Sequence, residues 1–151
     1  MAMLMERLED LSVYYWLKDT FSASPFIAIE DGFPDKVLVI PTIAVEAGKI
    51  DVVEFELGNR IGLRVRRWYI DIYATNKSQR DEIGYELLDI LKDGIPVFDY
   101  NDGFPPAFSP ARAGTLIIQS KSYSPIKISA DVVGKLYYRA TITFVAQNDK
   151  V

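Results

Sequence analysis

The sequence of 151 residues contains neither cysteine nor histidine. The absence of cysteine excludes disulfide bonds, thiolate metal sites and cysteine nucleophiles. The absence of histidine removes the commonest general base and the commonest metal ligand. These absences restrict the enzyme options sharply but leave carboxylate-only mechanisms open. The sequence shows no recognisable catalytic motif, and we expect no catalytic residue, no cofactor and no metal.

A long hydrophobic run is also absent, because no segment approaches the roughly 18 apolar residues that a membrane span requires. The start of the chain is acidic, with Glu6, Glu9 and Asp10 against a single arginine, Arg7. A secretory signal peptide would show a basic start followed by an apolar stretch. We therefore expect a protein that stays in the cytoplasm in which it is made and has no membrane partner.

The composition is that of an ordinary globular protein, with 49% hydrophobic and 25% charged residues. The formal net charge is −4, whereas a protein that binds nucleic acid on its own is usually basic. A domain of roughly 150 residues buries about 68–70% of its unfolded surface, which is enough for one substantial core. We expect residues 1–151 to form a single domain.

The N-terminal segment carries the periodicity of an amphipathic helix. Leu4, Leu8, Leu11 and Tyr15 recur at steps of four and three, which places them on one helical stripe. The charged residues of this segment lie mostly off that stripe. The pattern predicts a helix from Ala2 to Phe21.

A second helix is predicted between Ser78 and Gly94. Ser78 is a favourable N-cap residue, and Asp81 three positions later completes a pattern similar to a capping box. The predicted buried stripe has four members: Ile83, Leu87, Ile90 and Leu91. Gly94 suits the position after a helix end, because glycine readily adopts the left-handed conformation found there.

A long strand is predicted from Leu63 to Ala74. Its first part places Leu63 and Val65 on one face. Its second part places four apolar side chains on the other face: Trp68, Ile70, Ile72 and Ala74. Because strand side chains alternate with period 2, one residue must be out of step near Arg66 and Arg67. This predicts a bulge, or a strand that leaves one surface for another.

The segments before the long strand predict further strands. Phe26–Glu30 is expected to be short, and Lys36–Glu46 contains Pro41, which predicts an edge strand, a bulge or two strands. Ala47–Lys49 has the composition of a hairpin turn. The alternation in Asp51–Leu57 then predicts a half-buried strand with an acidic outer face.

The C-terminal third predicts three more strands. Thr115–Ser120 and Ser124–Ser129 are expected to flank a turn. The last strand, Lys135–Ala146, alternates most regularly, with its even-numbered residues toward the core.

The segment Ile95–Gly114 contains four prolines and no regular pattern. Irregular segments of about 20 residues in compact domains are usually functional or disordered. Its aromatic residues argue against full disorder: Phe98, Tyr100, Phe104 and Phe108. We expect a loop that packs on the domain or on a neighbouring subunit.

Two carboxylates are candidates for chemistry. Asp71 lies among apolar neighbours, but period-2 counting places it on a face with Arg67, and this favours an ion-paired face. Asp99, Asn101 and Asp102 resemble part of a calcium loop, yet their spacing is too short and the final glutamate is missing. A turn is the favoured interpretation there.

The chain has one basic cluster, which consists of four arginines: Arg60, Arg64, Arg66 and Arg67. Arginine suits contact with phosphate, so DNA contact is one interpretation. The other is a subunit interface, in which the cluster pairs with acidic residues such as Glu54 and Glu56 of a neighbour. We expect the interface.

The order of elements and three segments together resemble the tail-terminator and tail-completion proteins of long-tailed bacteriophages. The segments are Arg67–Ala74, Gln79–Glu82 and Tyr138–Phe144, which lie in the long strand, the following helix and the last strand. The resemblance extends over most of the chain as a pattern.

The resemblance implies an α+β fold, with a mixed, mainly antiparallel β-sheet and two α-helices packed on one face. It implies a homohexameric ring that caps the head-proximal end of the tail tube and presents a surface to the neck, in the virion. In contractile phages, related proteins also hold the end of the sheath. DNA would pass through the ring as cargo, and no catalysis is implied.

Three alternatives remain open at this point. The nearest is a head-closure or connector protein of the same neck. A carboxylate-dependent enzyme would use Asp71 or Asp99. A small-molecule or peptide-binding module would use the aromatic loop.

Within the ring, the long strand is expected to act as two parts. Trp68–Ala74 would be anchored in the core, and Arg60–Arg67 would extend as a hairpin arm toward a neighbouring subunit. Val65 belongs to that arm and is a candidate interface residue, as are the four aromatic residues of the proline-rich loop.

Overall fold

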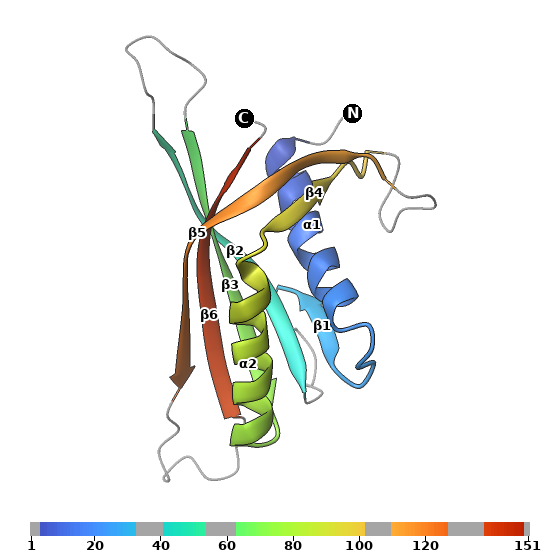
Figure 1. Ribbon diagram of the computed structural model, residues 1–151, viewed down its shortest axis with the longest axis vertical. Coiled ribbons are helices and arrows are strands. Elements are labelled where there is room, and N and C mark those ends of the chain that lie inside the picture. The colour runs from blue at the N-terminus through green and yellow to red at the C-terminus, as the bar shows by residue number, and fades with distance from the viewer. Residues whose placement is uncertain (1–3, 33–40, 54–62, 102–109, 127–137, 150–151) are drawn as a thin grey trace.

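The computed structural model describes residues 4–32, 41–53, 63–101, 110–126 and 138–149 (Figure 1). Two helices and six strands follow one another in the described residues: α1 (Met5–Thr20), β1 (Ala28–Asp31), β2 (Thr42–Val53), β3 (Leu63–Ala74), α2 (Lys77–Leu91), β4 (Ile95–Phe98), β5 (Arg112–Ile126) and β6 (Tyr138–Asn148). The strands form one sheet in the order β1-β2-β3-β6-β5-β4. Only the β1–β2 pair is parallel among these described strands. The expected α+β fold with a mixed, mainly antiparallel sheet is confirmed.

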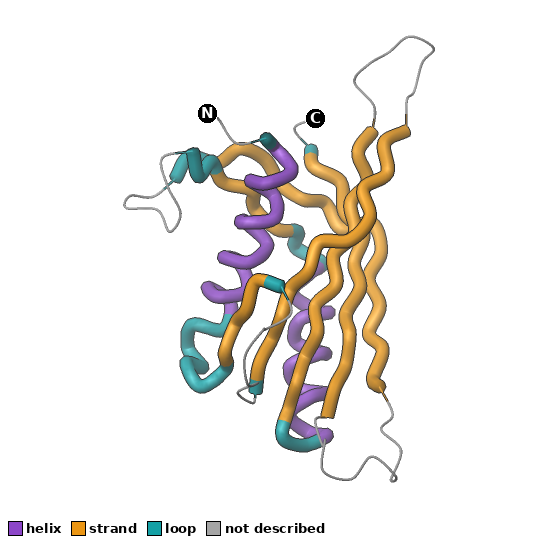
Figure 2. Tube along the Cα trace, turned by 180° about the vertical axis from the view of Figure 1, so that it is seen from behind, coloured by secondary structure: helices purple, strands orange, loops and turns teal. Residues whose placement is uncertain are grey.

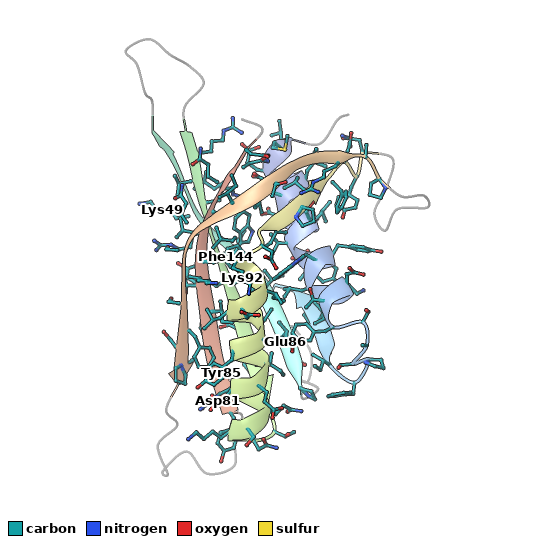
Figure 3. All side chains as sticks on the ribbon, in the orientation of Figure 1. Lys49, Asp81, Tyr85, Glu86, Lys92 and Phe144 are labelled. Carbon is teal, nitrogen blue, oxygen red and sulfur yellow. The ribbon has the colours of Figure 1, made fainter. Side chains whose placement is uncertain are left out.

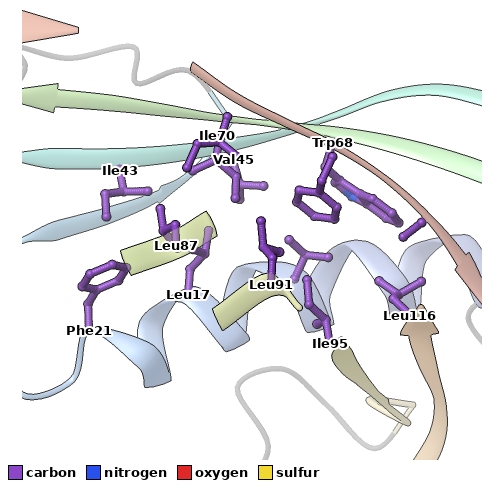
Figure 4. Close-up of a cluster of buried hydrophobic side chains, with 14 of the residues drawn as sticks. Leu17, Phe21, Ile43, Val45, Trp68, Ile70, Leu87, Leu91, Ile95 and Leu116 are labelled. Atoms are coloured by element: carbon purple, nitrogen blue, oxygen red, sulfur yellow. The ribbon is translucent and has the colours of Figure 1, made fainter. Parts of the chain in front are cut away.

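Both helices pack on the same face of the sheet. Leu17 of α1, Leu87 of α2 and Ile70 of β3 are fully buried in one hydrophobic cluster (Figure 4). In Figure 1 α2 lies in front of the strands, and after a turn of 180° the strands lie in front of it (Figure 2). The opposite face of the sheet, which we call the open face, is covered by neither of these helices.

The predicted bounds of β3 are confirmed, but the predicted break in its period is wrong. β3 pairs with β6 from Val65 to Ala74 without any shift in register. Arg66 is only 3% exposed and lies on the helix-covered face together with Trp68 and Ile70. Counting arginine as a solvent-facing residue made the buried face seem to begin at Trp68.

The bulge lies instead in β2, between Ala47 and Ile50. The predicted hairpin turn at Ala47–Lys49 is therefore wrong, because β2 continues through it to Val53. A glycine is needed at this bulge, since a Cβ added to Gly48 would lie 2.6 Å from a ring carbon of Tyr69.

A second shift in register occurs in β5, between Ile118 and Ser120. The predicted turn between two strands is wrong here as well, because Arg112–Ile126 is one continuous strand. The residues facing the two bulges, Arg67 of β3 and Val145 of β6, are paired with each other. The two irregularities therefore lie on one line across the sheet, and bulges bend strands and increase their twist. We call the part of β3 at and beyond this line, Leu63–Arg67, its outer half, and Trp68–Ala74 its inner half.

The predicted proline-rich loop is shorter than expected at its start, because Ile95–Phe98 forms strand β4 against β5. Pro96 is tolerated since β4 is the last strand of the sheet, where a missing N–H group costs no ladder bond. Tyr100 is 1% exposed and packs near the rings of Phe98 and Tyr15.

Helix α2 begins earlier than predicted. Asn76 is the N-cap residue, and its Oδ1 accepts a hydrogen bond of 2.8 Å from the backbone N–H of Gln79. The side chain of Gln79 accepts in turn from the backbone N–H of Thr75 at 2.9 Å. Ser78 lies inside the helix, so the predicted cap was wrong, whereas the left-handed Gly94 is confirmed by its φ of 78°.

Candidate functional site

Arg66 is the centre of a buried ionic network between β3 and α1. Its Nη1 lies 3.3 Å from Glu9 Oε1, and its Nη2 lies 3.0 Å from Asp10 Oδ1. Nη1 also donates to the backbone carbonyl of Glu6 at 2.9 Å. Successive turns of α1 are thereby bound to the outer half of β3.

Aromatic and amide side chains complete this network. Trp68 Nε1 donates to Asp10 at 3.2 Å, and the Arg66 guanidinium lies 4.6 Å from the centroid of the indole. On β6, Phe144 stacks against Trp68 at 5.4 Å between ring centroids. Asn148, also on β6, donates to Glu9 at 3.0 Å. Three elements therefore meet at Arg66.

The electrostatic balance of the network is set by burial. Burial raises the pKa of Glu9, while the hydrogen bond from Asn148 and the positive charge of Arg66 act in the opposite direction. Buried ion pairs recover their desolvation cost only when both partners are well placed. The clearest effect of the network is therefore to specify how α1 lies on the sheet.

The described arginines of the basic cluster do not form one patch. Arg66 is buried, Arg64 pairs with Glu6 of α1 at the surface, and Arg67 is exposed on the open face. Arg64 and Arg66 thus pair with acids of their own chain. A neighbour as the partner stays a prediction for this cluster, and Glu54, Glu56 and Arg60 lie outside the described residues.

The open face carries apolar side chains at its outer end. Val65 and Val145 are half-buried there, and Ile117 of β5 is 54% exposed. Gln147 of β6 pairs with both Val65 and Ile117, which places these two side chains on one face in the same row. An exposed apolar patch bordered by a charged residue such as Arg67 is typical of a protein contact.

Of the four aromatic residues predicted at an interface, two lie in the part of the chain that the structure describes. Tyr100 is buried within the domain and Phe98 is half-buried beside it, so both contribute to the core around α1. Phe104 and Phe108 lie outside the described residues. Any contact of this region with a neighbour stays a prediction.

The carboxylate candidates have structural partners. Asp71 accepts from Thr141 Oγ1 at 2.8 Å and lies 3.4 Å from Arg139, as expected for an ion-paired face. Asp99 accepts from the backbone N–H of Asn101 at 2.9 Å, which stabilises a turn. Within the described ranges, no three acidic side chains are arranged to hold a metal ion.

One cluster was missed by sequence reasoning. Tyr123 of β5 donates to Asp81 of α2 at 2.6 Å, and burial together with Asp81 raises the pKa of Tyr123 to about 12. The ring also meets Tyr85 edge-on at 5.4 Å; Figure 3 labels Asp81 and Tyr85 on α2. Gly84 makes room for this ring, and a glycine inside a helix was the available signal.

A small pocket opens beside the Arg66 network, where β1 ends. It has a volume of about 120 Å³ and is lined by Arg7 and Asp10 of α1, Asp31 of β1, Val45–Ala47 of β2 and the indole of Trp68. Burial raises the pKa of Asp31, and the nearby Asp10 raises it further against the opposing effect of Arg7. Asp10 is already paired with Arg66, and the register of β2 places the Glu46 side chain on the open face, so Arg7 and Asp31 are the charged side chains that remain at this pocket.

Neither described helix has the length and apolar character needed to cross a membrane. In the described residues, the sheet has one helix-covered face and one open face, and an ionic network joins Arg66 of β3 to helix α1. No protein-family model matches this chain, and no curated protein matches its sequence.

Proposed function

We propose that this chain is a structural protein of a phage virion, which assembles into a ring at the head-proximal end of the tail. The observation that carries the proposal is the outer end of the open face, where Val65, Val145 and Ile117 lie together beyond the reach of both described helices. A surface of this kind is suited to contact with another subunit.

A ring requires each subunit to present two different surfaces, because its contacts are head-to-tail and close on themselves. The outer half of β3 supplies one of these two surfaces. The Arg66 network holds one side of the strand against α1, so the opposite side is presented to the exterior in a fixed orientation. Pre-ordering of this kind lowers the entropic cost of assembly.

The proposed ring terminates the tail tube, joins it to the neck and, in a contractile tail, contacts the sheath. A net charge of −4 per subunit disfavours strong retention of passing DNA. The two carboxylates considered for catalysis, Asp71 and Asp99, act as structural groups in this proposal.

Light scattering coupled to size-exclusion chromatography tests the proposal, together with negative-stain imaging of the purified protein. We expect closed rings of a single size, hexameric by the resemblance, which bind one end of purified tail tubes and stop their extension. A monomer at every concentration, with no affinity for tail tubes, would contradict it. Rings that bind the head connector and leave tubes free would instead indicate a head-closure protein.

A further inference from the structure

The outer surface of helix α2 carries an exposed aromatic side chain with acids beside it. Tyr85 is 59% exposed, and Glu82 and Glu86 are exposed as well. Figure 3 labels Tyr85 and Glu86 on this helix. Neither glutamate forms an ion pair with a described residue. Like charges four positions apart on a helix repel each other, so a cation placed over this pair would stabilise it.

The bases of α2 leave this negative charge in place. Arg80 pairs with its neighbour Asp81 at 3.1 Å. Lys92, just after the helix, pairs with Asp89 at 3.0 Å. Lys77 lies at the first position of the helix, about 12 Å along the axis from the exposed tyrosine. The surface around that tyrosine is therefore acidic.

The ring of Tyr85 is supported by strand β5. It meets the ring of Tyr123 edge-on, with 5.4 Å between the ring centroids. Tyr123 in turn donates to Asp81 at 2.6 Å, so the supporting ring is itself fixed to α2. An exposed tyrosine whose ring is held in position is typical of the residues that dominate binding energy at protein interfaces.

The open face carries the complementary chemistry at its outer end. Arg67 is exposed there and forms no ion pair with a described residue. The bulge of β2 that faces Arg67 contains a second exposed base, Lys49, and Glu46 is the exposed acid that precedes the bulge. These three described charges are positive in balance. Beside them lie the apolar side chains of Val65 and Ile117.

The two surfaces lie on opposite sides of the sheet. Helix α2 packs on the covered face, whereas the outer half of β3 presents Arg67 on the open face (Figure 1, Figure 2). A head-to-tail contact needs two different surfaces that complement each other on every copy. One copy of this chain carries both, and a second copy is therefore the partner that the charges and the apolar groups fit.

We propose that Tyr85 of one copy packs on the apolar outer end of the open face of the next copy, with Glu82 and Glu86 paired to Arg67 there. Carboxylates accept strong hydrogen bonds from a guanidinium group, which also stacks on a tyrosine ring. This inference rests on the self-assembly in the proposed function. It adds the second surface of the ring contact and the residues that meet across it.

Charge reversal tests the contact by light scattering. Arg67→Glu, and Glu82→Lys combined with Glu86→Lys, should each raise the apparent dissociation constant of the assembly by about tenfold or more, because like charges then face each other. All three changes together restore opposite charges and should recover most of the assembly. Asp19→Lys is the matched control and should assemble as the wild type does, since Asp19 is an exposed acid of the other helix.

The aromatic part of the contact has its own test. Tyr85→Ala leaves both glutamates in place and should weaken the assembly by about thirtyfold, as expected for a residue at the centre of an interface. Tyr85→Phe keeps the ring and should assemble nearly as the wild type does.

A cross-linking experiment decides the case in which a substitution impairs folding. Because the chain has no cysteine, Glu86→Cys combined with Ser120→Cys gives one thiol on each surface. Ser120 is exposed on the open face in the same row as Arg67, since Val145 pairs with both. A short bis-maleimide should produce a ladder of covalent oligomers from the double variant and none from either single variant.

Three results would overturn the contact. If the wild type forms rings and both reversed variants form them equally well, or the ladder is absent, the ring contact lies elsewhere and the ring stands. If the glutamate variant keeps its ring but no longer binds tail tubes, the surface around Tyr85 belongs to the tube. If the wild type is monomeric at every concentration, the contact and the proposed ring fail together.

Discussion

The two halves of β3 lie on one continuous strand but are stabilised by different interactions. The inner half places Ile70 and Ile72, both fully buried, in an apolar core beneath the helices. The outer half buries Arg66 to 3% exposure and holds it with Glu9 and Asp10. Apolar burial is tolerant of orientation, whereas a buried ion pair is stable only in a narrow range of geometries.

This difference between the halves explains why the outer half of β3 is suited to contact another subunit. Its helix-covered side is fixed by directional contacts to α1, and its open side carries the half-buried Val65 and the exposed Arg67. The inner half is specialised for stability instead. Substitutions in the two halves should therefore separate folding from assembly.

The largest effect is expected at the centre of the inner half. Ile70→Asp buries an unpaired carboxylate in the apolar core, which should cost more than about 4 kcal/mol and unfold the domain. Circular dichroism with urea denaturation measures this. Val65→Asp, on the half-buried open face, is the matched change and should fold with less than about 1 kcal/mol of loss. Equal losses would remove the distinction between the halves.

The next largest effect is expected at the ionic network. Arg66→Met leaves the buried Glu9 without its cation and should cost about 3–5 kcal/mol in urea denaturation. Arg64→Met removes only the surface pair with Glu6 and should cost less than about 1 kcal/mol. A loss at Arg66 as small as that at Arg64 would show that the network contributes little.

The same variant should change the pH dependence of stability. Burial already raises the pKa of Glu9, and removal of the Arg66 charge raises it further. A carboxyl whose pKa is higher in the folded state binds its proton more tightly there, so its protonation favours folding as pH falls. Relative to the wild type, Arg66→Met should recover stability as the pH falls from neutral toward 4.5, the ordinary pKa of a glutamate. A loss that is constant over this range would assign the defect to packing.

A smaller effect is expected where α2 meets β5. A Cβ on Gly84 would lie 2.2 Å from a ring carbon of Tyr123, so Gly84→Ala should overpack the contact. The strain of about 1–3 kcal/mol should exceed the gain of about 1 kcal/mol in helix propensity. Adding Tyr123→Ala to Gly84→Ala tests the cause: the added methyl should then become neutral or stabilising. If Gly84→Ala alone raises the melting temperature, the ring does not restrict this position.

The smallest effect concerns the start of α2. Asn76→Ala removes the hydrogen bond to the Gln79 N–H and should cost about 1 kcal/mol. Ser78→Ala should change stability by less than about 0.5 kcal/mol, because Ser78 lies within the helix. Thermal melts of both variants check the assignment, and the reverse order of losses would restore Ser78 as the cap.

Much of the fold was predictable because its patterns are local. The stripe of α2, the bounds of β3 and the alternation of β6 from Tyr138 onward follow from period 3.6 and period 2. In α1 the predicted stripe is only half right: Leu8 and Leu11 are buried, whereas Leu4 precedes the helix and is exposed, as is Tyr15. The left-handed Gly94 follows from the absence of a Cβ. These features need no knowledge of distant partners.

The rest depends on contacts between distant residues. Gly48 and Gln119 lie at bulges within continuous strands, which the composition of a short window cannot distinguish from turns. Arg66 is buried only because α1 supplies acids 57 positions away at Glu9. The pocket beside Trp68 likewise combines three strands and a helix, so no sequence motif marks it.

The most direct test of the division between the halves is the mass of folded Val65→Asp in solution, measured by light scattering beside the wild type. Thr143→Asp is the control, since Thr143 pairs with Tyr69 on the open face of the inner half. We predict a ring for the wild type and the control, and a folded monomer for Val65→Asp. A Val65→Asp protein with the mass of the wild-type ring would contradict the claim that the outer half of β3 carries the subunit contact.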